Sequence, residues 1–342
     1  MTSSPRRMRV LVIAAFASAL VGCARTSPTG PLAAEPPDVR TIVVGGSPTE
    51  VAVAGDAVWV ADARRGRLVA VDPATARPTA RPVRIDAPLD LAVGEGALWV
   101  TSGTGAVRRI DPSTRRAALV ARVRDPGGVA AGLGSVWVTS RRDGTVTALD
   151  PRTGAMRGRP VRTGTVPGDV VVGFGAVWVA NTQDGTVSRL DPRSRQPIGG
   201  PIQVAEAQIL ALAAGQDGVW VAATDSAQNA SVELRRIEPA NGALDERAVG
   251  LPTGVPVDLA AGLGSVWSTD VGNRLPGTPG RDPALLRVAA DARVPAGRPI
   301  PVGDEPTGVA TGAGAVWVTS AGDGALRRIV PGAVDAVPRD AG

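Results

Sequence analysis

The stretch VWVANTQDGTVSRLDP, residues 177–192, decides the fold of this chain. It centres on a tryptophan inside an apolar run, and the same pattern surrounds every tryptophan of the sequence. The seven tryptophans are Trp59, Trp99, Trp137, Trp178, Trp220, Trp267 and Trp317. Their mean spacing of about 43 residues is typical of propeller blades of four strands each.

Each repeated unit divides into four expected strands. A short strand of small residues, such as 90–93, leads through a glycine turn to the tryptophan strand. The tryptophan strand is apolar on both faces, as expected for a sheet packed between two others. An Asp-Gly pair, as at 184–185, predicts a tight turn with positive φ at both positions before an alternating third strand, 186–190. Asp-Pro then begins the turn to a more polar outer strand.

The N-terminal part of the chain supplies a strand that the repeats lack. Seven units leave only six outer strands between them, and residues 41–45 resemble the outer strand at 299–303. We therefore expect 41–45 to complete the last blade and remove the exposed sheet edges. The prediction is an all-β, seven-bladed β-propeller of four-stranded antiparallel blades over 41–331, with a C-terminal tail at 332–342. The alternatives are an open solenoid or a ring of six blades.

The composition excludes several kinds of chemistry. The chain of 342 residues contains no His and one Cys. It therefore has no Ser-His-Asp triad, no His metal ligand, no CxxC site and no intrachain disulfide. The net charge of +5 is not gathered into a basic run, so charge does not predict nucleic-acid binding.

The first 40 residues predict export and anchoring. Residues 1–22 combine a basic start with a short apolar run, as in a secretory signal peptide. Leu20-Val21-Gly22-Cys23 resembles the lipobox of bacterial lipoproteins, which implies cleavage before Cys23 and a diacylglyceryl group on its sulfur. Residues 23–40 then form a flexible Pro-rich tether, and the protein is anchored to the extracytoplasmic face of the cell membrane. The alternative is an ordinary signal peptide with an incidental Cys.

Two polar positions recur at one end of each unit, nine residues before and three residues after the tryptophan. In a tight hairpin they face each other, which pairs Glu50 with Asp62, Asp90 with Ser102, Asp169 with Asn181, and Asp258 with Asp270. Like charges opposite each other need a cation, an Arg or a raised pKa. These residues are therefore the candidate site for Ca²⁺, Mg²⁺, or a cationic or polyol ligand. The alternative is that they cap turns and are well solvated.

Two long loops leave the same end of the ring. Residues 223–231 are polar, and residues 270–283 carry Arg274 and Arg281, our candidates for a recognition loop. Equally, these loops are surface insertions that the fold tolerates. The tryptophans are expected to pack between blades rather than to bind ligand.

The unit at 177–192 resembles the repeats of YVTN-type propellers and of the streptogramin (virginiamycin B) lyase family. The resemblance implies a propeller fold and, for the lyases, a histidine base beside a magnesium ion. Because this chain has no His, the predicted function is a non-catalytic, lipid-anchored scaffold that binds a small ligand or an envelope protein as a monomer. The alternative is a metal-dependent lyase or hydrolase that uses the acidic channel mouth.

Overall fold

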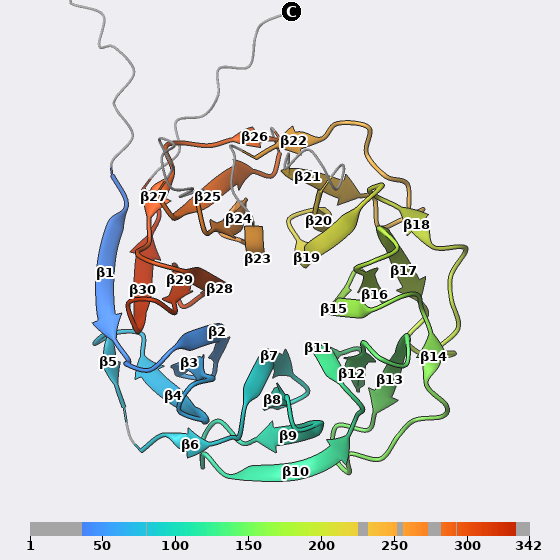
Figure 1. Cartoon of the computed structure of the whole chain (residues 1–342), viewed down its shortest axis with the longest axis horizontal. Coiled ribbons are helices and arrows are strands. Elements are labelled where there is room, and N and C mark those ends of the chain that lie inside the picture. The colour runs from blue at the N-terminus through green and yellow to red at the C-terminus, as the bar shows by residue number, and fades with distance from the viewer. Residues whose placement is uncertain are drawn as a thin grey trace, which may run out of the picture. The chain divides into compact units, whose positions relative to one another are not determined.

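The structure is a computed structural model that describes residues 36–79, 81–224, 232–251, 256–272, 282–291 and 293–332. All regular elements among these residues are β-strands, and they form seven antiparallel sheets around a common axis (Figure 1). Within the same residues, no helix has the length and apolar character needed to cross a membrane. Cys23, Arg274 and Arg281 lie outside the described residues, as do the signal segment and most of both long loops.

We number the blades in chain order and name their strands inner, second, third and outer. Blade 1 contains β2 (Pro48–Ala54), β3 (Ala57–Asp62), β4 (Arg67–Asp72) and an outer strand split into β5 (Arg77–Pro78) and β6 (Val83–Arg84). Blade 2 contains β7 (Pro88–Gly94), β8 (Ala97–Ser102), β9 (Ala106–Ile110) and β10 (Ala117–Arg122). Blade 3 contains β11 (Pro126–Gly132), β12 (Ser135–Ser140), β13 (Thr145–Leu149) and β14 (Val161–Arg162). Blade 4 contains β15 (Pro167–Gly173), β16 (Ala176–Asn181), β17 (Thr186–Leu190) and β18 (Ile202–Gln203).

The remaining three blades repeat this order. Blade 5 contains β19 (Gln208–Gly215), β20 (Gly218–Thr224), β21 (Val232–Ile237) and β22 (Val249–Gly250). Blade 6 contains β23 (Pro256–Gly262), β24 (Ser265–Asp270), β25 (Ala284–Ala289) and the outer pieces β26 (Val294–Pro295) and β27 (Ile300–Pro301). Blade 7 contains β28 (Pro306–Gly312), β29 (Ala315–Ser320) and β30 (Ala325–Val330), with β1 (Asp38–Val43) as its outer strand.

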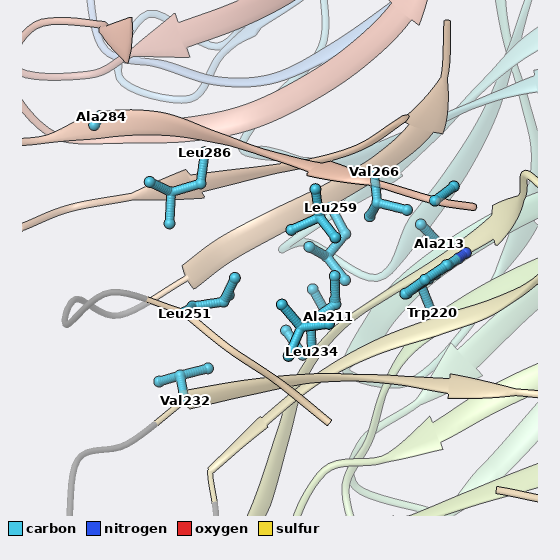
Figure 2. Packing of buried hydrophobic residues seen from close by; sticks show 14 residues of the cluster. Ala211, Ala213, Trp220, Val232, Leu234, Leu251, Leu259, Val266, Ala284 and Leu286 are labelled. Atoms are coloured by element: carbon cyan, nitrogen blue, oxygen red, sulfur yellow. The ribbon is translucent and has the colours of Figure 1, made fainter. Parts of the chain in front are cut away.

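The tryptophans form the contacts between blades, as expected. Each of the seven is at most 1% exposed and packs against apolar residues of the following blade. Between blades 5 and 6, Trp220 lies in one cluster with Leu259 and Val266 (Figure 2). The core is therefore a ring of seven separate interfaces rather than one central core.

The turns differ from the prediction in one respect. Between β16 and β17, Gly185 has a φ of 63°, but Asp184 does not adopt positive φ, because four residues separate the paired Asn181 and Thr186. The two-residue turn with positive φ at both positions joins the inner and second strands instead. In blade 4 it is formed by Phe174 and Gly175, with φ of 53° and 73°.

The Asp-Pro turns before the outer strands follow the prediction. The Asp111 carboxylate accepts hydrogen bonds from the backbone N–H groups of Ser113 and Thr114, at 2.9 Å and 3.1 Å. Because a hydrogen bond from the Ser113 hydroxyl and these two backbone bonds stabilise the charged form, the pKa of Asp111 falls to about 2. Asp72, Asp150 and Asp191 accept the same pair of backbone bonds.

The N-terminal strand closes the ring. β1 runs antiparallel to β30, from Asp38 opposite Val330 to Val43 opposite Ala325. Pairing thus begins three residues before the expected start at Thr41, so residues 38–40 belong to the propeller rather than to the tether. The expected closure between the two ends of the chain is confirmed.

Candidate functional site

A cavity of about 290 Å³ lies among the inner strands of the blades. Its wall is built mainly from Val, Leu and Ala, the small apolar residues that let the inner strands converge. Four acidic side chains also line it, which we call the channel carboxyls: Glu50, Asp90, Asp169 and Asp258. They come from blades 1, 2, 4 and 6, so the structure brings together all four acidic residues predicted nine positions before a tryptophan.

The three channel aspartates connect neighbouring blades. Asp90 accepts a hydrogen bond on Oδ1 from its own neighbour, the Leu91 N–H, at 2.7 Å. Its Oδ2 accepts from the Val129 N–H of blade 3, also at 2.7 Å. Asp169 and Asp258 repeat the arrangement with Val170 and Leu212, and with Leu259 and Val309. Each aspartate therefore uses both oxygens to join an even-numbered blade to the next odd one.

Small residues occupy the position of the channel aspartates in blades 3, 5 and 7. The equivalent position there is Gly128, Ala211 or Gly308. A Cβ atom at Gly128 would lie 2.9 Å from the Gly168 carbonyl oxygen, and one at Gly308 would lie 2.8 Å from Oε2 of Glu50. Side chains at these two glycines would therefore collide with the neighbouring blade.

The aspartate links join the blades in pairs, so in a ring of seven the blade that carries Glu50, blade 1, is left without a partner. Its following blade is blade 2, where the Leu91 N–H already donates to Asp90. The Val51 N–H lowers the pKa of Glu50 slightly, and within the described residues no donor from another blade reaches the carboxyl. Glu50 is thus the channel carboxyl with acceptor capacity to spare.

The channel carboxyls hold protons more strongly than ordinary carboxyl groups. Burial is the main cause in all four, and it raises the pKa of Asp169 to about 6, that of Asp90 to about 7 and that of Asp258 to about 8. Burial, followed by the charges of the three aspartates, raises the pKa of Glu50 well above its usual value. Near neutral pH the channel therefore offers both O–H donors and carboxylate acceptors.

The predicted pairing across the hairpin is wrong. A β-bulge follows the first residue of the inner strand, so Asp62 faces Pro48, Ser102 faces Pro88, Asn181 faces Pro167 and Asp270 faces Pro256. An inserted residue shifts the register and reverses which face a side chain takes. None of the four residues that follow the tryptophan, Asp62, Ser102, Asn181 and Asp270, lines the cavity.

The residues three positions after the tryptophan stabilise turns instead. The Asp62 carboxylate is fully buried, lies 3.0 Å from the Arg67 guanidinium and accepts from the Ser47 and Arg65 N–H groups. The Asn181 amide donates to the hydroxyls of Thr186 and Ser188. Asp270 accepts from the Gly272 N–H. Of the two interpretations of these positions, turn stabilisation is the one that their contacts favour, but the expectation that they are well solvated is wrong, because Asp62, Asn181 and Asp270 are all buried.

The contacts show two features that sequence reasoning missed. Arg189, Arg287 and Arg328 lie over the rings of Trp178, Trp267 and Trp317, at 5.1, 5.1 and 5.9 Å from the ring centres. The links made by the channel aspartates were also missed, although Asp alternates with Gly or Ala in the sequence at their position. Across the described ranges, no three Asp, Glu, Cys or His side chains are grouped closely enough to hold a metal ion.

Comparisons with known proteins bear on the fold. No family model and no curated protein matches the chain. Among solved structures, a streptogramin B lyase matches with 16% identity and a TM-score of 0.68, over 87% of this chain and 98% of its own. Virginiamycin B lyase from Staphylococcus aureus matches with 15% identity and a TM-score of 0.68, over 86% of this chain and 99% of its own.

A second kind of propeller is similar as well. The WD40 domain of Neurospora crassa Pan2 matches with 10% identity and a TM-score of 0.63, over 85% of this chain and 90% of its own. At such identities a likeness establishes architecture and not activity. The chain therefore folds as a streptogramin lyase-like, seven-bladed β-propeller.

Proposed function

We propose that this protein is a lipid-anchored, extracytoplasmic propeller that binds a small polar ligand in its channel and does not catalyse a reaction. The observation that supports this best is the placement of the four channel carboxyls around one cavity. Three of them are engaged in holding blades together, whereas Glu50 retains acceptor capacity. Glu50 is therefore the residue on which recognition rests.

The cavity sets the class of ligand. Its volume of about 290 Å³ is at the small end of the range for ligand sites, which begins near ~300 Å³. Its polar groups are carboxyls with raised pKa, which accept hydrogen bonds from ammonium or hydroxyl groups and donate to hydroxyl oxygens. The ligand class is thus a polyol or an organic cation, because within the described residues no three acidic side chains are grouped closely enough to hold a hard cation.

The absence of histidine supports a binding role. One of the similar solved structures is a catalytically inactive histidine-to-alanine variant of virginiamycin B lyase from Staphylococcus aureus, with quinupristin. This chain contains no His at any position. A lyase or hydrolase activity here would need a metal ion and a carboxylate base instead, and turnover of a cyclic ester in the presence of Mg²⁺ would establish it.

The membrane anchor is proposed from Cys23, the only cysteine, which follows a short apolar run. Expression of the full chain in a bacterium that processes lipoproteins should place the protein in the membrane pellet. After a high-salt wash, which removes proteins held to anionic lipid by charge, the Cys23→Ala variant should leave the pellet for the soluble or secreted fraction. A variant that stays in the pellet would contradict the anchor.

The channel is tested by thermal shift with a panel of Ca²⁺, Mg²⁺, spermidine and sorbitol. At least one of the two organic probes should raise the Tm of the wild-type protein, and Glu50→Gln should reduce that shift. Glu206→Gln is the control because it removes an exposed carboxyl. The proposal fails if neither organic probe shifts the wild type, or if Glu50→Gln binds as well as the control.

The pH dependence of the shift identifies the ligand type. A cation competes with protons for the channel carboxyls, so its binding should strengthen as pH rises from about 6 to about 8. A polyol uses the protonated groups as donors, so its binding should weaken over the same range.

A further inference from the structure

One side of the propeller carries both kinds of tight turn. The turns between inner and second strands and the turns between third and outer strands lie together, because residues of both kinds line one groove: Gly55, Asp56 and Gly96 with Asp111, Pro112 and Arg115. We call this side the turn face. It is the opposite end of the inner strands from the one where the channel aspartates start.

Large apolar side chains are exposed at the tips of this face. Leu133, Phe174 and Leu263 occupy the first position of the inner turns in blades 3, 4 and 6, and each is more than 40% exposed. Such turns ordinarily carry Asn, Asp or Gly, because the position needs positive φ. Here the φ values are 54°, 53° and 55°. Neither exposure nor backbone conformation favours Leu or Phe there, so these residues serve something other than the fold.

In blades 3 and 4, a second apolar side chain is exposed nearer the outer strand. Met156 of blade 3 and Ile198 of blade 4 follow the outer turns of the same two blades, and they are 62% and 38% exposed. The two outer turns approach each other, since a Cβ atom at Gly158 would lie 3.2 Å from the Arg195 side chain. Blades 3 and 4 thus expose four large apolar side chains near the turn face, which we call the apolar patch: Leu133, Phe174, Met156 and Ile198.

Exposed arginines lie near this patch, together with one acid, Glu95, whose carboxylate accepts from the Gly134 N–H at 2.8 Å. Arg152 and Arg193 stand at matching exposed positions in the outer turns of blades 3 and 4. The neighbouring acids point back into the turns, where Asp150 and Asp191 accept the N–H groups of those same arginines at 2.9 Å and 3.0 Å. The carboxylates are thus engaged within the turns, while both arginines are exposed. Apolar tips flanked by arginines are complementary to an anionic lipid surface.

The described chain also begins on this face. Asp38 pairs with Val330, the last residue of a third strand, which places the start of β1 on the turn face. The chain between Cys23 and Pro36 can span at most about 45 Å. An anchor at Cys23 would therefore be joined to the same side of the propeller as the apolar patch.

We propose that the turn face over blades 3 and 4 docks on an anionic bilayer, with Leu133 and Phe174 entering the interface and Arg152 and Arg193 contacting the headgroups. This contact is separate from the acyl anchor. It persists in a chain without lipid, and it fixes the orientation of the channel axis relative to the membrane.

The test uses the unlipidated chain from Ala24 onward, which keeps every described strand and the ring closure. It is sedimented with vesicles of phosphatidylcholine, alone or mixed with phosphatidylglycerol. We expect binding to the anionic vesicles only, weakened by salt. Leu133→Asn with Phe174→Asn should lower the partition coefficient at least about tenfold, and Arg152→Gln with Arg193→Gln should lower it about tenfold.

The controls separate docking from folding. Asn tolerates positive φ, so the double Asn variant should keep the wild-type Tm. Ala313→Asn changes the same turn position of blade 7, with a φ of 49°, and should bind vesicles like the wild type. A wild-type chain that stays in solution with anionic vesicles, or a double Asn variant that binds equally well, overturns the proposal and leaves a protein as the partner of this face. Either result is independent of the fate of Cys23→Ala.

Discussion

Single carboxyl groups on the inner strands lie where burial disfavours their charged form. Asp90, Asp169 and Asp258 each receive two backbone hydrogen bonds, which lower their pKa values, yet burial outweighs those bonds and the pKa values rise. The aspartates of the outer turns have similar bonds without the burial, and the pKa of Asp111 falls to about 2. The same chemical group thus behaves oppositely at the centre and at the rim of the molecule.

This contrast predicts a stability maximum in mildly acidic solution. A carboxyl whose pKa is raised on folding binds protons in the folded state that the unfolded state releases, so stability falls as pH rises from about 4 to about 8. A carboxyl whose pKa is lowered, such as Asp111, contributes stability that is lost as pH falls from about 4 to about 2. Calorimetric Tm values measured between about pH 3 and pH 9 should therefore peak near pH 4–5.

Glu50→Gln tests the alkaline side of that curve. Gln cannot ionise, so the variant should lose less Tm than the wild type between pH 5 and pH 8. Each pKa unit removed corresponds to about 1.4 kcal/mol, or roughly 2 °C for a domain of this size. Glu206→Gln, at an exposed position, should keep the wild-type slope. A Tm that rises from pH 5 to pH 8 in the wild type would contradict this account.

At the scale of elements, the second strand of each blade is the unit of stability. Its tryptophan reaches the next blade, so one side chain holds two sheets together. In blade 4, Trp178 packs against Leu212 and Val221 of blade 5, and Arg189 covers its ring. Removing it would therefore weaken a whole blade interface and not a single contact.

Trp178→Ala should lower the free energy of unfolding by about 3–5 kcal/mol, because it leaves a cavity in a close-packed interface. Arg189→Ala should cost about 0.5–1 kcal/mol, the usual size of a cation–π contact at a partly exposed site. Met156→Ala is the matched control, since Met156 is 62% exposed. Urea unfolding followed by tryptophan fluorescence measures all three, and a loss for Trp178→Ala no larger than for Met156→Ala would show that the interface does not depend on the indole.

The strands and the ring could be predicted because they depend on periodic features. The tryptophan spacing sets the blades, and apolar runs without alternation mark strands buried on both faces. The bulge at the start of each inner strand could not be predicted, because it comes from how two residues of the inner strand, such as Gly127 and Gly128, lie opposite one residue of the second strand, here Thr139. The sequence therefore indicated the four channel carboxyls, but it assigned them the wrong partners and did not indicate their links to the next blade.

At the scale of the molecule, the ring is closed by contacts between the two ends of the chain. Ile42 is 5% exposed and shares a cluster with Trp317, and the Val44 and Gly45 N–H groups donate to the Gly324 carbonyl. The inner strands close separately, since the Thr307 hydroxyl donates to the Pro48 carbonyl at 3.0 Å. Blade 7 thus joins blade 1 at its centre without β1, but its outer edge is covered by β1 alone.

A chain that begins at Gly46 should therefore fold into a ring with one open edge. It loses the six backbone pairings of β1 and exposes β30 as a template for pairing with another molecule. We expect a lower Tm and concentration-dependent dimers or larger species in size-exclusion chromatography coupled to light scattering. A chain that begins at Pro36 is the control and should remain monomeric, because it keeps β1. A peptide of residues 36–45 added to the shortened chain should restore the monomer and the Tm, since it can pair with β30 as β1 does. If the shortened chain stays monomeric and equally stable without the peptide, the closing strand contributes nothing that the inner contacts do not already provide.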